Sequence, residues 1–400
     1  MNNIEFMENE DRLLARTYQK IPVTAARAEK ARIWDTEGKE YLDFMSGYGV
    51  AILGHSFPDV REALKRQINE VYITHASVYS PVRSQFLMEL SSLLPWSSSR
   101  MYLSNSGAES VEAAVKIAIK YTGKKKIISM EKAYHGKTLG ALSITYSNRY
   151  RKSFGGMLYP NVEFLKFGDS DQLRAALKKQ DVAAVFMEPV QGEGGVNIPP
   201  DDYLKAAREM AEEAGTLLVM DEIQSGLGRT GKMWAHEHWG IKPDIITIGK
   251  GIGGGIPMGV TAGRADIMEV LETGEQTSTT GGNPLACAAG IEVLKALKGG
   301  YVERASIQGK YLLGRMEEEL GGHRLVSNNR GLGMMLALDL RIRFLPVLMN
   351  MISEGLITLY SGISTIRMLP PYVITEEDSD LAVTRIRKAL DIQLGNSGVT

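Results

Sequence analysis

The 400-residue sequence contains one cysteine, Cys287, so no disulfide can form within a single chain. This cysteine lies in the apolar run Leu285-Ala-Cys-Ala-Ala, which favours a buried structural thiol and fits a reducing compartment. The formal net charge is only −1, which gives no electrostatic reason to expect nucleic acid or an anionic membrane as a partner. A small molecule is the expected partner.

Long apolar runs are also missing. No stretch approaches the roughly 18 apolar residues of a membrane span. The first ten residues are acidic and unlike a signal peptide, so we expect a soluble, cytoplasmic protein. The six histidines are scattered, and the closest pair, His236 and His238, would point to different sides of a helix, so no metal site is predicted.

Between about residue 100 and residue 290, short apolar runs alternate with longer segments of helical period. The expected strands are 100–103, 126–130, 183–187, 217–220 and 245–248. The expected helices are 109–122, 171–179, 201–214 and 283–297. This alternation predicts an α/β fold with a mostly parallel central sheet that helices cover on both faces.

The two ends of the chain have a different pattern. Residues 31–45 predict a hairpin that turns at Glu37-Gly38, and residues 300–400 alternate amphipathic helices with short strands such as 334–338. We expect both ends to join in one smaller α+β domain. The expected division is an N-terminal segment at 1–50, a large ligand-binding domain at 51–295 and a C-terminal segment at 296–400.

Two polar residues follow apolar runs in this block. Asp221 ends the run that begins at Thr216, and Lys250 ends the run that begins at Asp244. Open α/β sheets bind ligands at the C-terminal edges of their strands. A desolvated lysine amine can lose its proton and attack a carbonyl, and an aspartate can keep a pyridine nitrogen protonated. Together they are the pair needed to hold pyridoxal phosphate, with Lys250 forming the Schiff base.

Two alternatives apply to Lys250. A lone lysine after a strand is usually a solvated loop residue, so the hypothesis depends on its neighbours. Gly249, Gly251 and Gly254 also satisfy the dinucleotide pattern G-x-G-x-x-G. That fingerprint requires a helix to open on the glycines, whereas Pro257 follows here, so we reject a nicotinamide cofactor.

Further motifs follow the expected strands. Residues 105–109 precede a helix whose N-terminus could bind phosphate, and 278–284 offer hydroxyls before another helix. Residues 133–137 supply an aromatic ring that could stack on a planar ligand, and 188–195 supply two carboxylates and a glutamine. Each motif alone is compatible with a turn or core residue that binds nothing, but their shared position at strand ends favours one site.

These motifs resemble those of class III pyridoxal-phosphate aminotransferases of the type I fold, the group that contains acetylornithine, ornithine and 4-aminobutyrate aminotransferases. The resemblance covers about residues 20–390 and is most specific at 188–195, 221–231 and 243–259. It implies pyridoxal 5'-phosphate as cofactor and a homodimer whose active site is shared across the interface.

The resemblance implies roles around the cofactor ring. Lys250 would form the Schiff base, Asp221 would contact the pyridine nitrogen and Gln224 the ring oxygen. Tyr134 would stack on one face of the ring, and Ile223 would lie against the other.

Four further residues match the phosphate contacts. Ser106, Gly107 and Ala108 match the phosphate loop, and Thr279 matches a threonine that reaches the phosphate from the neighbouring subunit.

The resemblance also implies substrate contacts. Arg367 would grip a substrate carboxylate, and Glu193 would pair with it when the donor carries its reacting amine at the far end. A movable ion pair lets one arginine serve both 2-oxoglutarate and an ω-amine. Tyr48 lies at a position that is tyrosine in ornithine aminotransferases but typically aliphatic in acetylornithine and 4-aminobutyrate aminotransferases. Lys137 replaces the usual second carboxylate-binding arginine, and a lysine offers a point charge rather than a planar fork.

The short C-terminal domain, over 340–348 and 366–375, resembles the archaeal arginine and lysine biosynthesis branch, whose substrates are acylated or carrier-bound. We therefore expect transfer of the terminal amine of a blocked ornithine or lysine to 2-oxoglutarate, with an amino-acid carrier protein as a possible partner. An ornithine or 4-aminobutyrate aminotransferase is the alternative, and Tyr48 favours ornithine. A racemase, a decarboxylase or a non-catalytic protein can share the fold.

Overall fold

The computed structural model describes residues 2–396. Its larger part contains a seven-stranded sheet with the order β4-β10-β9-β8-β7-β5-β6. The strands are β4 (Ser99–Ser104), β5 (Lys126–Met130), β6 (Val162–Leu165), β7 (Val182–Met187), β8 (Leu217–Asp221), β9 (Ile245–Ile248) and β10 (Gly259–Arg264). Neighbours from β9 to β6 are parallel, whereas β10 is antiparallel to both β9 and β4. The mostly parallel sheet is therefore confirmed.

All five strands expected between residues 100 and 290 are present, and the sheet contains two more that the sequence pattern does not predict, β6 and β10. Strand β6 has only four residues, and β10 begins with a glycine and contains a second one, which weakens a strand pattern. No α-helix begins on the glycines after β9. A four-residue 3-10 turn, η3 (Lys250–Gly253), lies there instead and leads to β10.

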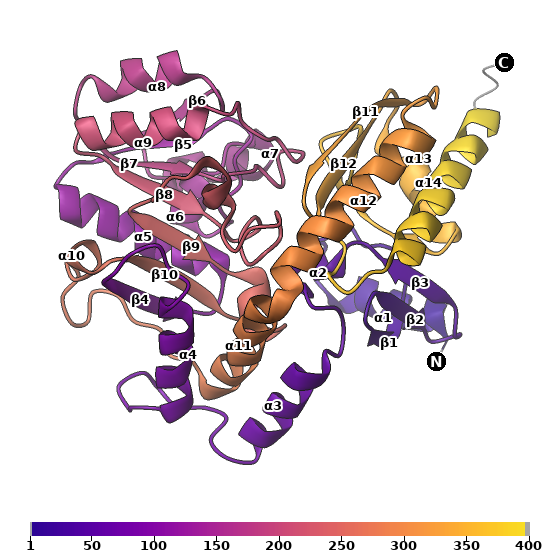
Figure 1. Cartoon of the computed structure of the whole chain (residues 1–400), viewed down its shortest axis with the longest axis horizontal. Coiled ribbons are helices and arrows are strands. Elements are labelled where there is room, and N and C mark those ends of the chain that lie inside the picture. Colours follow the sequence, from indigo (N-terminus) through magenta and orange to yellow (C-terminus); the bar gives the residue numbers. More distant parts are fainter. Residues whose placement is uncertain (1, 397–400) are drawn as a thin grey trace.

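Helices cover both faces of this sheet (Figure 1). Val185 of β7 packs in the same cluster as residues of α8 and α9, whereas Ala184 and Phe186 pack with residues of α5. This alternation is what a strand buried on both faces requires. The helices and 3-10 turns of this part are α3 (Pro58–Ile68), α4 (Pro81–Ser91), α5 (Gly107–Thr122), α6 (Leu139–Ser143), α7 (Asn148–Arg151), η1 (Lys152–Met157), α8 (Ser170–Leu177), α9 (Tyr203–Glu213), η2 (Ala235–Trp239), α10 (Ala265–Met268) and α11 (Pro284–Ala296).

The smaller part combines both ends of the chain (Figure 1). The two-residue strand β13 pairs in parallel with β3, and β2 and β3 form the predicted hairpin. Its elements are α1 (Asn3–Leu13), β1 (Ala25–Glu29), β2 (Arg32–Asp35), β3 (Glu40–Asp43), α2 (Ser46–Gly49), α12 (Val302–Leu320), β11 (Val326–Leu332), β12 (Met335–Leu340), α13 (Phe344–Ser353), β13 (Leu356–Ile357), β14 (Leu359–Ser361), β15 (Thr365–Met368) and α14 (Glu376–Asn396).

In Figure 1, α11 and α12 run from the larger part to the smaller one, joined by the π-helical turn η4 (Leu297–Tyr301). The domain limits at residues 50 and 295 stay a prediction. No helix within residues 2–396 is both long and apolar enough to cross a membrane.

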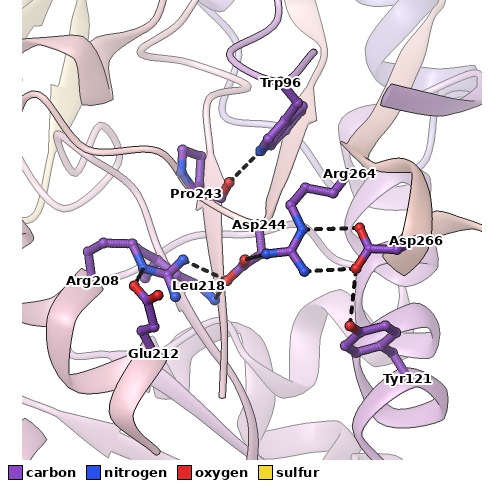
Figure 2. Close-up of polar contacts among 9 residues, drawn as sticks. All are labelled: Trp96, Tyr121, Arg208, Glu212, Leu218, Pro243, Asp244, Arg264 and Asp266. Atoms are coloured by element: carbon purple, nitrogen blue, oxygen red, sulfur yellow. Dashed lines mark hydrogen bonds and ion pairs between the residues drawn. The ribbon is translucent and has the colours of Figure 1, made fainter. Parts of the chain in front are cut away.

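Asp244 joins four elements at the beginning of β9 (Figure 2). Its Oδ2 accepts hydrogen bonds from Arg208 Nη1 of α9 at 2.7 Å and from the backbone N–H of Leu218 in β8 at 2.8 Å. Its Oδ1 accepts one from Arg264 Nη1 of β10 at 3.1 Å. These bonds support the register of β8 and β9, in which Asp221 lies opposite Thr247.

Candidate functional site

Lys250 follows β9 at the carboxyl edge of the sheet, as the sequence predicts. Its φ is +50°, which lies in the left-handed region. Residues other than glycine rarely adopt this conformation, and those that do are often found at functional sites. Burial lowers the pKa of the Lys250 amine, and the opposing charges of Glu193 and Asp221 do not restore it. The amine therefore loses its proton more easily than a solvated lysine and can act as a nucleophile.

Asp221 ends β8 and is buried. Its Oδ2 lies 2.6 Å from Nδ1 of His135, and its Oδ1 accepts a hydrogen bond from the backbone N–H of Ile223 at 3.0 Å. Burial alone would lower the pKa of His135, but the hydrogen bond and the charge of Asp221 outweigh it, so that this pKa is raised. His135 thus gives the buried Asp221 side chain a close polar partner inside the protein.

The sequence alone does not reveal a role for His135, although this residue lies in the 133–137 motif. Only the fold brings it to Asp221, 86 positions along the chain. Glu188, after β7, was also given no individual role. Burial raises the pKa of Glu188 to about 7. Its oxygens accept hydrogen bonds from the backbone N–H groups of Tyr134 at 3.0 Å and Gly192 at 2.9 Å, which ties together the loops of Tyr134 and Glu193.

Tyr134 forms an aromatic wall with Tyr150, a residue that no sequence motif marks. Their ring centroids are 5.9 Å apart at an angle of 78°, an edge-to-face arrangement. Nζ of Lys137 lies 4.6 Å from the centre of the Tyr150 ring and 5.7 Å from that of Tyr134. Lys137 is exposed, so its charge lies at the outer edge of this wall. Burial raises the pKa of Tyr134 to about 12, which keeps its hydroxyl protonated.

Arg367 of β15 and Glu193 form an ion pair, as predicted. Nη2 of Arg367 lies 2.6 Å from Oε1 of Glu193. The arginine also donates from Nη1 to Gln224 Oε1 at 3.2 Å and from Nε to the Tyr360 carbonyl at 3.3 Å. The Arg367 side chain is completely buried, whereas the Glu193 side chain is 26% exposed, so the glutamate is the partner with room to move.

The phosphate motif lies where α5 begins. Ser106 caps this helix by accepting a hydrogen bond from the Glu109 N–H, and Gly107 and Ala108 are its first two residues. The first N–H groups of a helix have no partner within it and suit an anion. A Cβ on Gly107 would lie 2.7 Å from Cδ1 of Ile223, so only glycine permits this close packing.

Two further predicted site residues, Thr279 and Tyr48, are not buried. Thr279 is exposed, and its neighbours Ser278 and Thr280 bond the Asn105 side chain at 3.0 and 2.9 Å. Tyr48 is half-exposed and lies within electrostatic reach of Glu193.

A cavity of about 890 Å³ opens beside the aromatic wall formed by Tyr134 and Tyr150. Its lining includes Lys132, Tyr134, Arg149, Tyr150, Arg151, Glu193, Tyr360 and Ser361.

This arrangement fits pyridoxal phosphate. The amine of Lys250, with its lowered pKa, suits an aldehyde, and the buried carboxylate of Asp221 suits a protonated ring nitrogen. The beginning of α5 suits a phosphate, and Tyr134 suits a planar ring.

Comparisons with known proteins agree with the family that the motifs predict. The model of the family "Aminotransferase class-III" matches residues 13–390. The chain is 42% identical to the [LysW]-aminoadipate semialdehyde/glutamate semialdehyde transaminase of Sulfurisphaera tokodaii, over 92% of this chain and 95% of that one. It is 38% identical to the acetylornithine aminotransferase of Methanopyrus kandleri, over 95% and 97%.

The structure also resembles solved structures. The ornithine aminotransferase of Toxoplasma gondii, with pyridoxal phosphate in partial occupancy at its active site, superposes with a TM-score of 0.94 at 34% identity. The superposition covers 99% of this chain and 95% of that one. The chain thus belongs to the class III aminotransferases, a family of pyridoxal-phosphate-dependent enzymes.

Proposed function

We propose that this enzyme moves the terminal amine of an N-acylated or carrier-bound ornithine or lysine to 2-oxoglutarate, giving a semialdehyde and glutamate. The observation that carries the proposal is the ion pair between buried Arg367 and accessible Glu193. The names of the relatives from S. tokodaii and M. kandleri support the blocked donor.

We assign the cofactor contacts to the residues that the family motifs indicate. Lys250 would attach pyridoxal phosphate, and Asp221 would face its ring nitrogen. The remaining contacts would come from Ser106, Gly107, Ala108, Tyr134, Ile223, Gln224 and, from a neighbouring subunit, Thr279. When bound, the cofactor supplies an aldehyde that accepts the amine and a ring that withdraws electrons from the reacting carbon.

The protein then has to move a proton and hold a charge. The amine of Lys250, once free, takes the proton from the substrate carbon and returns it to the other reacting carbon. Because its pKa is lowered, this amine is more readily found without its proton, and so able to accept one, than the amine of a solvated lysine. Asp221, held by His135, would face the ring nitrogen of the bound cofactor and stabilise a proton there.

Arg367 and Glu193 would select between the two substrates. 2-Oxoglutarate presents an α-carboxylate, which the planar guanidinium can bind through two parallel hydrogen bonds once Glu193 swings away. An ω-amine donor has no carboxylate at its reacting carbon. Glu193 then stays on the arginine and spares it the high cost of an unpaired buried charge.

The alternative donor is free ornithine. Tyr48 lies near Glu193 and could contact the carboxylate at the far end of ornithine. A 4-aminobutyrate aminotransferase would use the same ion pair but has less support, because Tyr48 resembles the tyrosine of ornithine aminotransferases rather than the aliphatic residue of the 4-aminobutyrate enzymes. Lys137 is the other substrate residue that we propose, as a cation at the entrance.

We further propose a homodimer, a carrier-protein partner and a cytoplasmic location. Support for the dimer comes from large apolar side chains exposed in one stretch of sequence, namely Ile68, Val71, Tyr72, Ile73, Val78 and Tyr79. Such a surface is typical of a protein interface. The name of the S. tokodaii relative, which includes LysW, supports the carrier.

A donor panel tests the function. The enzyme loaded with pyridoxal phosphate is given 2-oxoglutarate and either N-acetylornithine, N-acetyllysine, ornithine, lysine or 4-aminobutyrate, and glutamate is measured. We expect the highest kcat/KM among the acylated donors. A clear preference for free ornithine would select the alternative, and no glutamate from any of these ω-amines would reject an ω-aminotransferase.

A further inference from the structure

Residues 46–49 form a left-handed turn at the border of the site. Ser46, Gly47, Tyr48 and Gly49 have φ values of 49°, 59°, 61° and 80°. This conformation is strained for residues other than glycine, and it persists only where neighbouring contacts impose it. Because Ser46 and Tyr48 are not glycines, the turn must be held from outside.

Asp43, the last residue of β3, supplies these contacts. It is fully buried, and its Oδ1 accepts hydrogen bonds from the backbone N–H groups of Met45 at 2.9 Å and Ser46 at 3.0 Å. Its Oδ2 lies 2.7 Å from Nε2 of His55. His55 is fixed in turn by two backbone hydrogen bonds with Lys30, at 2.8 and 2.9 Å. A histidine beyond the turn thus anchors the carboxylate that holds its beginning.

The turn places the Tyr48 phenol within electrostatic reach of the ion pair between Glu193 and Arg367. Burial and the charge of Glu193 raise the pKa of Tyr48, whereas the charge of Arg367 lowers it to a smaller extent. Behind the phenol, Gly49 packs closely on Leu369, whose Cδ1 would lie 3.1 Å from a Cβ at position 49. Leu369 follows Arg367 by two residues, so the turn is seated on the segment that holds the arginine.

We propose that Asp43 and His55 are positioning residues for donor selectivity, which act by locking the 46–49 turn and thereby the place of Tyr48 beside the Glu193–Arg367 pair. The inference rests on the proposed ω-aminotransferase function. The small amino-acid end of free ornithine depends on one fixed phenol, whereas an acylated donor makes further contacts beyond it. Loosening the turn therefore weakens free ornithine selectively.

A double-mutant cycle tests this coupling. His55→Ala, Tyr48→Ile and the double variant are compared with wild type for ornithine and N-acetylornithine, with ornithine measured as donor or as competing inhibitor. We expect each single change to raise the KM or inhibition constant of ornithine by roughly tenfold, and the double variant to be no worse than Tyr48→Ile alone. His55→Gln, whose amide can donate from a similar place, restores the wild-type value.

Two further measurements separate positioning from general damage. In His55→Ala, the rate with glutamate as donor stays unchanged. His323→Ala, which removes a different histidine–aspartate contact, with Asp391, leaves all constants unchanged. Hydrogen exchange on the apoprotein should become faster at the N–H groups of Met45 and Ser46 in His55→Ala.

Additive effects in the double variant, or an unchanged ornithine constant in folded His55→Ala, would overturn the inference. Hydrogen exchange in His55→Ala that is as slow as in wild type at the N–H groups of Met45 and Ser46 would also overturn it. That measurement requires no substrate. If wild type made no glutamate from any ω-amine, the proposed function would fail, while the exchange experiment would still decide whether Asp43 and His55 hold the turn.

Discussion

His135 and Asp221 form a buried pair, with Nδ1 of the histidine 2.6 Å from Oδ2 of the aspartate. The aspartate ends a strand and the histidine lies in a loop after another strand, so the sheet itself brings them together. A carboxylate that has to stay charged away from water needs such a donor. We infer that the pair, rather than Asp221 alone, faces the ring nitrogen of the cofactor.

Removing the imidazole should therefore weaken catalysis without unfolding the protein. We expect His135→Leu to lower kcat by roughly tenfold to a hundredfold, because a hydrogen bond to a charged group contributes about 1.5–3 kcal/mol. His135→Asn keeps a donor near the place of Nδ1 and should retain more activity. Single-turnover rates and cofactor content measure the two effects separately. Equal activity of His135→Leu and wild type would contradict the paired role.

Lys250→Ala should abolish turnover while the protein stays folded and still holds pyridoxal phosphate without a covalent bond. The reason is that phosphate, ring and nitrogen contacts come from other residues. Cofactor content after gel filtration and glutamate formation are the measurements. Lys242→Ala, an exposed lysine at the other end of β9, is the matched control and should behave as wild type. Appreciable turnover by Lys250→Ala would show that another group attaches the cofactor.

The sequence predicted the strand ends better than the contacts between loops. Asp221 and Lys250 lie at the ends of short apolar runs between helical segments, a pattern typical of strands that are buried on both faces of a parallel sheet. The Asp221–His135 pair depends also on the conformation of the loop that carries His135 after β5, which no periodicity records. The left-handed turn at Tyr48 was likewise invisible, because Tyr48 is no glycine and its conformation comes from Asp43.

Glu188 should make the stability of the apoprotein depend on pH. Its pKa is 4.5 in an unfolded chain and about 7 in the fold. A raised carboxyl pKa contributes stability below pH 4.5 that is lost as the pH rises through about 7. Glu188→Gln lacks this loss. Relative to wild type, its free energy of unfolding should therefore rise with pH across this window, by on the order of 2–3 kcal/mol.

Urea unfolding of both apoproteins between about pH 5 and about pH 8 measures this difference. The exposed Glu213→Gln serves as control and should show a constant difference from wild type. A constant difference for Glu188→Gln as well would mean that its carboxyl group does not titrate in this range.

The exposed apolar stretch at 68–79 should form the dimer interface. Tyr79 is fully exposed, and Val71 is 55% exposed. We expect Val71→Asp with Tyr79→Asp to give monomers in sedimentation, because two charges would have to be buried in the interface. These monomers should lose pyridoxal phosphate, since Thr279 of one subunit is proposed to contact the phosphate of the other. A stable monomer with full cofactor content would contradict the shared site.

Donor choice should change when Glu193 is removed. In Glu193→Ala, Arg367 always offers its guanidinium to an α-carboxylate, which places the α-amine, rather than the terminal amine, at the reacting position. Loss of a charged hydrogen-bonded partner is worth about 2–3 kcal/mol, so glutamate should gain roughly a hundredfold over ω-amine donors in relative kcat/KM. Glu193→Gln keeps a hydrogen bond without the charge, so its relative kcat/KM for glutamate should fall between the values of wild type and Glu193→Ala.

The Arg367 side chain is completely buried, and Gln224 and the Tyr360 carbonyl still bond it, so the fold should survive the change. An unaltered donor ranking in Glu193→Ala would show that the Arg367–Glu193 ion pair does not select the donor, and would thereby reject the assignment of an ω-amine donor.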